Sequence, residues 1–217
     1  MPVIKSKNEN FFKKWSRDMA YVLGFLAADG ALYINKRGSH YFELQIKDLL
    51  VLRKIRKSLG SNHKITLRKK HKRQSQLYRL QIGSKIMFSD LIALGLMPKK
   101  AKTMNFPSVP KKFLTDFIRG YFDGDGSVWS GLMHKNRVNA SKALRVTFTS
   151  GNINFLKNLA VALHAGLKIN GVHSYYGNAH RLIYATKPSL ILFKFMYNKP
   201  TLYLKRKREI FQKYLLA

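Results

Sequence analysis

The sequence predicts an α+β protein made of two pseudo-symmetric halves, each with the element order αββαββα and one four-stranded antiparallel sheet. A nine-residue motif occurs twice, and similar helix-like and strand-like segments follow each copy. The motif reads VLGFLAADG at 22–30 and IRGYFDGDG at 118–126, so the copies lie 96 residues apart. That spacing is too long for a solenoid repeat and suits two copies of a small domain.

Each motif is an apolar run that carries small residues four positions apart. They are Gly24 and Ala28 in the first copy, and Gly120 and Gly124 in the second. Residues four apart share one face of a helix, and small residues there allow two helix backbones to approach closely. We therefore expect the two motif helices to pack side by side.

Each motif also ends in an Asp-Gly pair. Asp29 and Asp125 would lie at helix C-termini, where a carboxylate is typically unfavourable by ~0.3–1 kcal/mol. The glycines that follow, Gly30 and Gly126, are predicted to close the helices in the left-handed conformation. Side-by-side helices would bring both acids to one place, and exceptions to local rules concentrate at functional sites.

In the first half, local patterns predict every element. The segment YFELQI alternates as a half-buried strand does, and Asp48 precedes an amphipathic run that Gly60 closes. The expected order is a helix over about 18–29, two strands within 31–46 turning near 36–39, a helix after Asp48, a hairpin with its tip at 71–74, and a helix over 85–95.

A proline- and lysine-rich stretch separates the halves. It predicts a first half over 1–97, a linker over 98–112 and a second half over 113–217. The second half is expected to contain a motif helix over about 113–125, strands near 126–133 and 143–150, a helix over 153–166, strands near 167–175 and 180–186, a helix from Pro188, and a basic helix over 203–216.

The composition favours a polyanionic partner. The chain has 41 Lys and Arg residues against 10 Asp and Glu, a formal net charge of +31. Charge of this size opposes a compact state by self-repulsion, so a nucleic acid is the natural partner. The absence of cysteine excludes disulfides and cysteine-based zinc sites. No apolar run approaches the ~20 residues of a membrane-spanning helix, and we expect no membrane partner.

The two motifs, the linker and the element order resemble the LAGLIDADG homing endonucleases in their single-chain, two-repeat form, over nearly the whole chain. The second copy is the closer match, because the first has Ala27 where the family pattern often has Asp; its counterpart is Asp123. The resemblance implies a monomer whose motif helices form the interface between halves and whose two sheets form a saddle on double-stranded DNA. It implies metal-dependent double-strand cleavage at a specific, long DNA site. The alternatives are an intron RNA maturase and a cleavage-inactive DNA-binding protein of this fold.

On this resemblance, Asp29 and Asp125 are the metal ligands, joined by the backbone carbonyls of Ala28 and Gly124. Two carboxylates held close together repel, and a hard cation with oxygen ligands resolves that conflict. We expect Mg²⁺, with Mn²⁺ able to substitute and Ca²⁺ supporting binding without cleavage.

The resemblance also implies one basic catalytic residue in each half. Lys100, with Lys102 close behind, is the candidate in the first half, and Lys207 is the candidate in the second. Asp48 and Asn152 each begin the helix after a first hairpin, where a polar residue helps to hold the water network. The alternative for both residues is a role as a helix N-cap, which is compatible with a role in the water network.

DNA contacts are expected from hairpin tips and from the exposed faces of the strands. Basic tips meet phosphates, whereas Arg, Gln and Asn match the edges of bases. The tip and near-tip candidates are Lys36, Arg37, Arg68, Lys70, Lys72, Arg73, Lys135 and Arg137. The strand candidates are Tyr33, Asn35, Gln45, Arg79, Gln81, Arg145, Thr147, Thr149, Tyr175 and Arg181.

Overall fold

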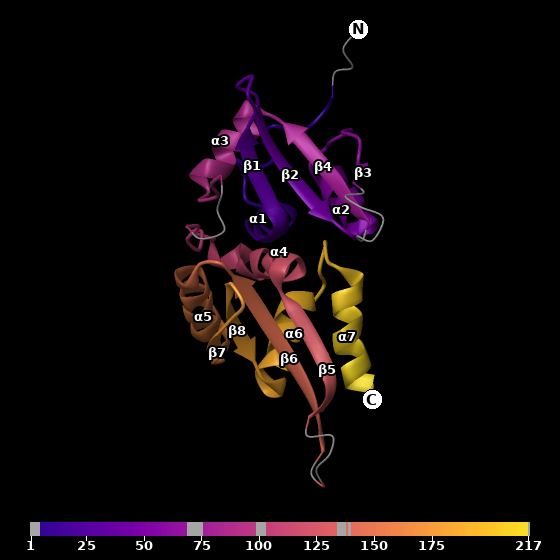
Figure 1. Ribbon diagram of the computed structural model, residues 1–217, viewed down its shortest axis with the longest axis vertical. Coiled ribbons are helices and arrows are strands. Elements are labelled where there is room, and N and C mark those ends of the chain that lie inside the picture. The colour runs from indigo at the N-terminus through magenta and orange to yellow at the C-terminus, as the bar shows by residue number, and fades with distance from the viewer. Residues whose placement is uncertain (1–4, 69–75, 99–102, 134–137, 139, 217) are drawn as a thin grey trace.

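The computed structural model describes residues 5–68, 76–98, 103–133, 138 and 140–216. It has two sheet-and-helix halves on either side of a central helix pair, α1 and α4 (Figure 1). The predicted α+β class and the two pseudo-repeat halves are confirmed. None of the helices in these residues has the length and apolar character needed to cross a membrane.

The first half has the predicted order αββαββα. Its four strands form one antiparallel sheet in the order β1-β2-β4-β3. The elements are α1 (Arg17–Asp29), β1 (Gly30–Ile34), β2 (His40–Ile46), α2 (Leu49–Ser58), β3 (Thr66–Arg68), β4 (Leu77–Gly83) and α3 (Lys85–Ala93).

The second half repeats this order and adds one helix at its end. Its sheet has the equivalent strand order β5-β6-β8-β7. After a short 3₁₀ turn, η2 (Lys111–Phe113), the elements are α4 (Leu114–Asp125), β5 (Ser127–Met133), β6 (Ser141–Ser150), α5 (Ile153–Leu167), β7 (Val172–Tyr176), β8 (Ala179–Tyr184), α6 (Thr186–Tyr197) and α7 (Lys205–Leu216).

Helix boundaries follow the signals present in the sequence. The Asp48 side chain accepts a hydrogen bond from the Val51 N–H at 3.0 Å, and Asn152 caps α5 in the same manner. Gly60 and Gly95 follow α2 and α3 with φ angles of 58° and 94°, the left-handed conformation that glycine tolerates best.

The motif glycines do not adopt that conformation, and the prediction for them was wrong. Gly30 has φ −81° and Gly126 has φ −77°, both extended, because each motif helix passes directly into a strand. Glycine is needed there for space. A Cβ at Gly30 would lie 2.6 Å from the carbonyl oxygen of Leu26, and one at Gly126 would lie 2.6 Å from that of Phe122.

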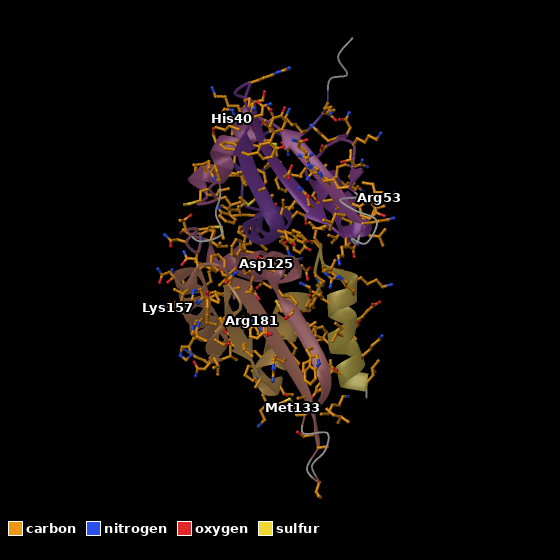
Figure 2. The ribbon with its side chains drawn as sticks, in the orientation of Figure 1. His40, Arg53, Asp125, Met133, Lys157 and Arg181 are labelled. Carbon is orange, nitrogen blue, oxygen red and sulfur yellow. The ribbon has the colours of Figure 1, made fainter. Side chains whose placement is uncertain are left out.

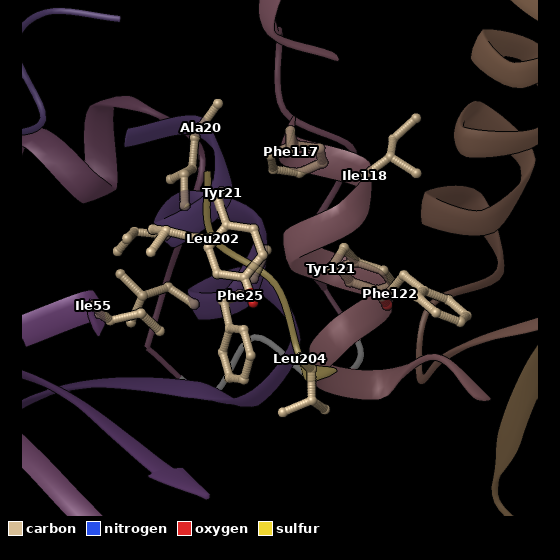
Figure 3. Packing of buried hydrophobic residues seen from close by; sticks show 14 of the residues in the cluster. Ala20, Tyr21, Phe25, Ile55, Phe117, Ile118, Tyr121, Phe122, Leu202 and Leu204 are labelled. Carbon is tan, nitrogen blue, oxygen red and sulfur yellow. The ribbon is translucent and has the colours of Figure 1, made fainter. Parts of the chain in front are cut away.

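The central helices meet backbone to backbone. A Cβ at Gly24 would overlap the carbonyl oxygen of Phe117, and a Cβ at Gly120 would overlap that of Tyr21. The contacts are reciprocal, as a pseudo-twofold axis requires, and aromatic side chains of both helices fill the space around the crossing (Figure 3). The small-residue stripes therefore act as the sequence predicted.

Each sheet has one face packed against helices and one face turned away from them. Alternate residues such as Phe42, Leu80, Val146 and Leu182 are buried on the helix side. We call the other side the open face. On the first sheet it comprises Ala31, Tyr33, Tyr41, Glu43, Gln45, Thr66, Arg68, Arg79 and Gln81; on the second it comprises Ser127, Trp129, Arg145, Thr147, Thr149, Ser174, Tyr176, Arg181 and Ile183.

Candidate functional site

Two acidic residues lie at adjoining helix ends, at the junction of the halves. Asp29 is the last residue of α1 and Asp125 the last of α4, and both are exposed. A Cβ at Gly124 would lie 3.5 Å from the Asp29 backbone nitrogen, which shows how closely these ends approach. Figure 2 shows Asp125 between the two halves.

A buried phenol borders this acidic centre. Burial, together with the charges of Asp125 and Asp29, holds the pKa of Tyr121 far above its usual range, and its hydroxyl donates to the Thr149 carbonyl at 2.7 Å. Tyr121 therefore stays neutral and forms a low-dielectric wall beside the acids.

The acidic centre offers oxygen donors only. In the part of the chain that the structure describes, no cluster of three or more His, Cys, Asp and Glu residues could hold a metal ion. Two carboxylates fit a hard divalent cation whose coordination is completed by backbone carbonyls, water and phosphate oxygens. They do not fit a structural zinc site, which takes four protein ligands.

Lys207 lies inside the protein, although the sequence suggested a residue that faces the substrate. Its Nζ donates to the backbone carbonyls of Phe122 at 2.6 Å, Asp123 at 2.8 Å and Gly126 at 2.5 Å, with Gly124 at 3.4 Å. Burial lowers the pKa of Lys207 to about 8, against the opposing charge of Asp123. The amine thus binds the carbonyl end of α4, where a cation offsets the helix dipole.

An arginine that the sequence reasoning did not select lies closer to solvent at this place. Arg206 is exposed and, with Asp29, Gln45 and Asp48, lines a cavity of about 260 Å³. Adjacent residues of a helix point about 100° apart. The lysine- and arginine-rich start of α7 signalled a basic group, but the position could not be chosen without the structure.

The two helix-capping residues have further contacts. Asp48 caps α2 and also lines the cavity beside Asp29. Asn152 caps α5, and its Nδ2 donates to the Met104 carbonyl at 3.0 Å, which ties down the chain before α4. The predicted capping role is confirmed for both; their role toward water stays a prediction.

Asp123 is buried, although it lines the same cavity as Asp29. It accepts hydrogen bonds from the Tyr21 hydroxyl at 2.9 Å, the Tyr197 hydroxyl at 2.9 Å and the Leu204 N–H at 2.7 Å. Burial raises the pKa of Asp123, while these donors and the Lys207 charge oppose the rise. Its contacts join α1, α4, α6 and the start of α7, which accounts for an acid at this position.

A second buried group fixes the connection between α6 and α7. Arg119 is fully buried, pairs with Asp116, and donates to the carbonyls of Met196 at 2.9 Å and Leu202 at 2.7 Å. Arg17 of α1 reaches Asp116 at 3.4 Å from the other half. The sequence signalled this group only as charged residues within an apolar helix. Figure 3 shows the stretch from Leu202 to Leu204 crossing the helix pair.

The strand candidates for DNA contact fall mostly on the open faces. Asn35 and Tyr175 are the exceptions. Asn35 lies in the turn after β1, and Tyr175 pairs with His180 on the opposite face, with ring centroids 4.8 Å apart. Tyr176 lies instead beside Arg181, whose guanidinium is 4.5 Å from its ring centroid. The DNA-contact candidates that lie on the open faces are Tyr33, Gln45, Arg68, Arg79 and Gln81 in the first sheet, and Arg145, Thr147, Thr149 and Arg181 in the second.

The candidates at the tips are only partly described. Asn35, Lys36 and Arg37 form the turn between β1 and β2, where Asn35 Oδ1 accepts the N–H groups of Arg37 at 3.0 Å and Ser39 at 2.8 Å. Asn35 therefore has a turn-forming role. The remaining candidates lie outside the described residues: Lys70, Lys72, Arg73, Lys100, Lys102, Lys135 and Arg137.

No protein-family model matches the chain. The uncharacterized protein MJ0398 of Methanocaldococcus jannaschii is 28% identical over 213 residues, 92% of this chain and 72% of that protein. Three similar solved structures have TM-scores of 0.61–0.64: a lysine-to-alanine variant of I-SmaMI, the LAGLIDADG meganuclease I-AabMI bound to uncleaved DNA, and the LAGLIDADG homing endonuclease I-LtrWI bound to target DNA.

These structures are similar along nearly their whole length. They are 14%, 14% and 13% identical to this chain, cover 93%, 90% and 96% of it, and are themselves covered over 90%, 88% and 90%. At such identity the likeness establishes the fold. The chain therefore has the fold of the single-chain, two-repeat LAGLIDADG homing endonucleases.

Proposed function

We propose that the protein is a site-specific homing endonuclease that makes a double-strand break in a long DNA target by divalent-metal-dependent phosphodiester hydrolysis. The observation that carries the proposal is the position of Asp29 and Asp125 at the ends of two closely packed helices, between two open sheet faces. A protein that only bound DNA would gain nothing from exposed carboxylates near phosphates. The fold is that of proteins solved bound to DNA, which supports the proposal.

Asp29 and Asp125 would hold Mg²⁺, with the carbonyls of Ala28 and Gly124 as further oxygen donors. Bound there, the ion would supply Lewis acidity toward a phosphate oxygen and lower the pKa of a bound water. Mn²⁺ is expected to substitute, and Ca²⁺ is expected to support binding without cleavage. Both helix ends are exposed, so a phosphate has access to the acids.

The basic residues take separate roles in this proposal. Lys207 is a positioning residue, because its amine is bound to the carbonyls that precede and follow Asp125. Arg206 is an exposed cation that lines the same cavity as Asp29, as Lys47 also does, and it would stabilise the negative charge that builds up on the phosphate. Lys100 stays the predicted basic residue of the first half, and Asp48 is suited to hold water in the cavity.

The two open faces would straddle the duplex, one on each half-site, and the protein would act as a monomer. Phosphate contacts then dominate the affinity for DNA. Binding should weaken by orders of magnitude between ~50 and ~200 mM salt, because neutralised phosphates release counterions. A flat salt response in an electrophoretic or fluorescence titration would contradict the saddle arrangement.

The decisive experiment is cleavage of a randomised-target plasmid library with Mg²⁺, comparing the wild type with Asp29→Asn and Asp125→Asn. We expect discrete cuts in the wild type and a loss of at least roughly 10²–10³-fold in each variant, the range found when one electrostatic stabiliser is removed. Glu209→Gln is the matched control, since this α7 acid is half-exposed and pairs only with Lys205 at 3.7 Å among the described residues.

Binding in Ca²⁺ separates loss of chemistry from loss of fold. Both Asn variants should retain the selected DNA target with an affinity close to that of the wild type. If the wild type binds DNA or intron RNA tightly and cuts nothing with Mg²⁺ or Mn²⁺, the protein is a binding protein or a maturase of this fold.

A further inference from the structure

A carboxylate lies in the middle of the open face of the first sheet. Glu43 of β2 is only 7% exposed and stands between Ala31 of β1 and Gln81 of β4 in the strand register. It accepts hydrogen bonds from Arg79 Nε at 2.8 Å and Gln45 Nε2 at 2.5 Å. The Arg79 Nη2 also contacts the same carboxylate oxygen as Nε.

These contacts extend to neighbouring side chains. The Tyr33 hydroxyl donates to Glu43 at 3.3 Å and accepts from Arg79 Nη2 at 2.9 Å and from Gln81 Nε2. Arg68 Nη1 reaches Gln45 Oε1 at 3.4 Å. We call the set Tyr33, Glu43, Gln45, Arg68, Arg79 and Gln81 the Glu43 network. Five of its six members are residues that the sequence suggested as DNA contacts.

The hydrogen bonds of the Glu43 network determine which polar groups of its members stay available to contact DNA. Arg79 uses Nε and Nη2 within the network, which leaves Nη1 to donate outward. Gln81 keeps its Oε1 and one N–H, the pair that matches the N6 and N7 edge of adenine. Gln45 uses its amide oxygen and one amide hydrogen inside the network. Each of these side chains is thus oriented by another one.

Electrostatics support this assignment. Although burial opposes it, the hydrogen bond and charge of Glu43 raise the pKa of Arg79, so the guanidinium stays protonated. A carboxylate facing a duplex repels its phosphates and cannot serve affinity in general. Buried ion pairs add little stability compared with apolar residues, and their best attested use is to specify one arrangement.

The second sheet has no such network at the equivalent positions. Thr147 stands where Glu43 does, between Ser127 and Ile183 in the register. Arg181, the counterpart of Arg79, stacks on Tyr176, and no carboxylate pairs with it in the described part of the chain. The two open faces therefore differ in how their side chains are held.

We propose that Glu43 is a specificity-determining residue that couples the readout of neighbouring base pairs in the DNA half-site under the first sheet. The inference rests on the proposed DNA-binding function. Its consequence is that the base preference opposite Arg79 depends on the bases opposite Gln45 and Gln81. Gln45 shares the carboxylate with Arg79, and Gln81 is linked to both through the Tyr33 hydroxyl. In the half-site under the second sheet, each base pair is read independently.

The test uses the full chain and a randomised double-stranded DNA library, with binding measured in Ca²⁺. The selected duplex is then altered at single and paired positions, and competition binding gives the preference at each one. Arg79→Ala identifies the base pair that Arg79 faces. The variants compared are Glu43→Gln, which keeps the shape and removes the charge, and Thr147→Val, the matched change in the second sheet.

We expect the wild type to show non-additive preferences, by more than about threefold, only under the first sheet. Glu43→Gln should bind random DNA severalfold more tightly, because one repulsive charge is gone, and should lose about tenfold in base preference, within the range of one specific contact. The base preferences that remain in Glu43→Gln should be additive between neighbouring positions. Thr147→Val should change at most the one base pair that it faces.

Additive preferences in the wild type, or an unchanged profile in Glu43→Gln, would overturn the proposal while leaving the proposed function intact. Absence of sequence-specific binding by the wild type would overturn both. If circular dichroism shows that Glu43→Gln does not fold, Gln45→Ala replaces it, with Thr149→Ala as its counterpart. Gln45→Ala must then alter the preference opposite Arg79, and no change there would overturn the proposal.

Discussion

The two motif helices are alike where they meet and differ along the stripe that α4 turns toward α6 and the connection to α7. Both present a glycine to the crossing and end in an exposed acid. Along another stripe, α1 is apolar and α4 is charged, and both sets are buried. The equivalent pairs are Ala20 and Asp116, Leu23 and Arg119, and Ala27 and Asp123.

The difference follows from α7, the helix that only the second half has among the described residues. Arg119 and Asp123 hold the connection that leads into α7, through the Leu202 carbonyl and the Leu204 N–H. That helix in turn brings Lys207 to the end of α4. The shared positions thus serve the crossing and the acidic centre, whereas the differing positions attach one extra element.

The largest expected effect comes from making α4 resemble α1 at its buried charge. Arg119→Leu leaves the buried Asp116 with Arg17, at 3.4 Å, as its one cationic partner among the described residues, and it leaves two carbonyls without their donor. It should lower the free energy of unfolding by about 3–5 kcal/mol, as for one partner removed from a buried pair. Urea unfolding measures this, with Leu23→Met as a volume-conserving control. A cost below about 1 kcal/mol would show that the pair does not hold the connection.

The glycines of the crossing should be equally intolerant of substitution. Gly24→Ala and Gly120→Ala each place a methyl group against a backbone carbonyl that cannot rotate away, so each should cost about 3 kcal/mol, the upper end for overpacking. Gly166→Ala in α5 is the control: its Cβ would meet nothing within 4 Å, and it should stabilise the protein slightly. Unequal costs at Gly24 and Gly120 would contradict the reciprocal geometry.

Asp123→Ala gives α4 the residue that α1 has at Ala27. It removes the acceptor of two hydroxyls and one N–H, which should cost about 2 kcal/mol. The loss should be local: amide hydrogen exchange should accelerate at Leu204 and in α7 more than in α1. Uniform acceleration over the whole chain would show that Asp123 does not act through this connection.

The smallest expected effect concerns His63, which precedes β3 and has Gly171 as its counterpart. Burial, and next the charges of Lys5 and Lys7, lower the pKa of His63 below 6.5. The unfolded chain then binds a proton that the folded chain does not, so stability decreases as the pH falls below about 6.5. Compared with the wild type, His63→Gln should lose less stability between pH 7 and pH 5. An identical pH profile would show that His63 does not contribute.

Elements formed by local signals were predictable. The cap at Asp48, the hairpin that turns at Gly38 and the motif helices depend on residues a few positions apart. The contacts of Arg119 and Asp123 join residues about 80 positions apart, and no local pattern indicates them. Glycine at Gly30 suits two conformations, so its presence alone could not distinguish a left-handed cap from close packing.

Among the candidate site residues, some could likewise be identified from the sequence and others needed the structure. The pairing of Asp29 with Asp125 follows from the repeat itself. The choice between Lys207 and Arg206, and between Tyr175 and Tyr176, depends on the rotation of a helix and the register of a strand. A shift of one residue reverses the direction of a side chain in a strand, so the sequence located these regions without fixing the residue.

The contact of α1 and α4 at Gly24 and Gly120 has a mechanical consequence. Side chains can change rotamers and let two helices slide, but two backbones in contact cannot. The distance between the backbones of Asp29 and Asp125 is therefore set by the helix crossing, before any ligand binds. In the proposed complex, a duplex that engages both acids would have to adjust its own geometry to that distance, and the deformation energy would fall on the DNA.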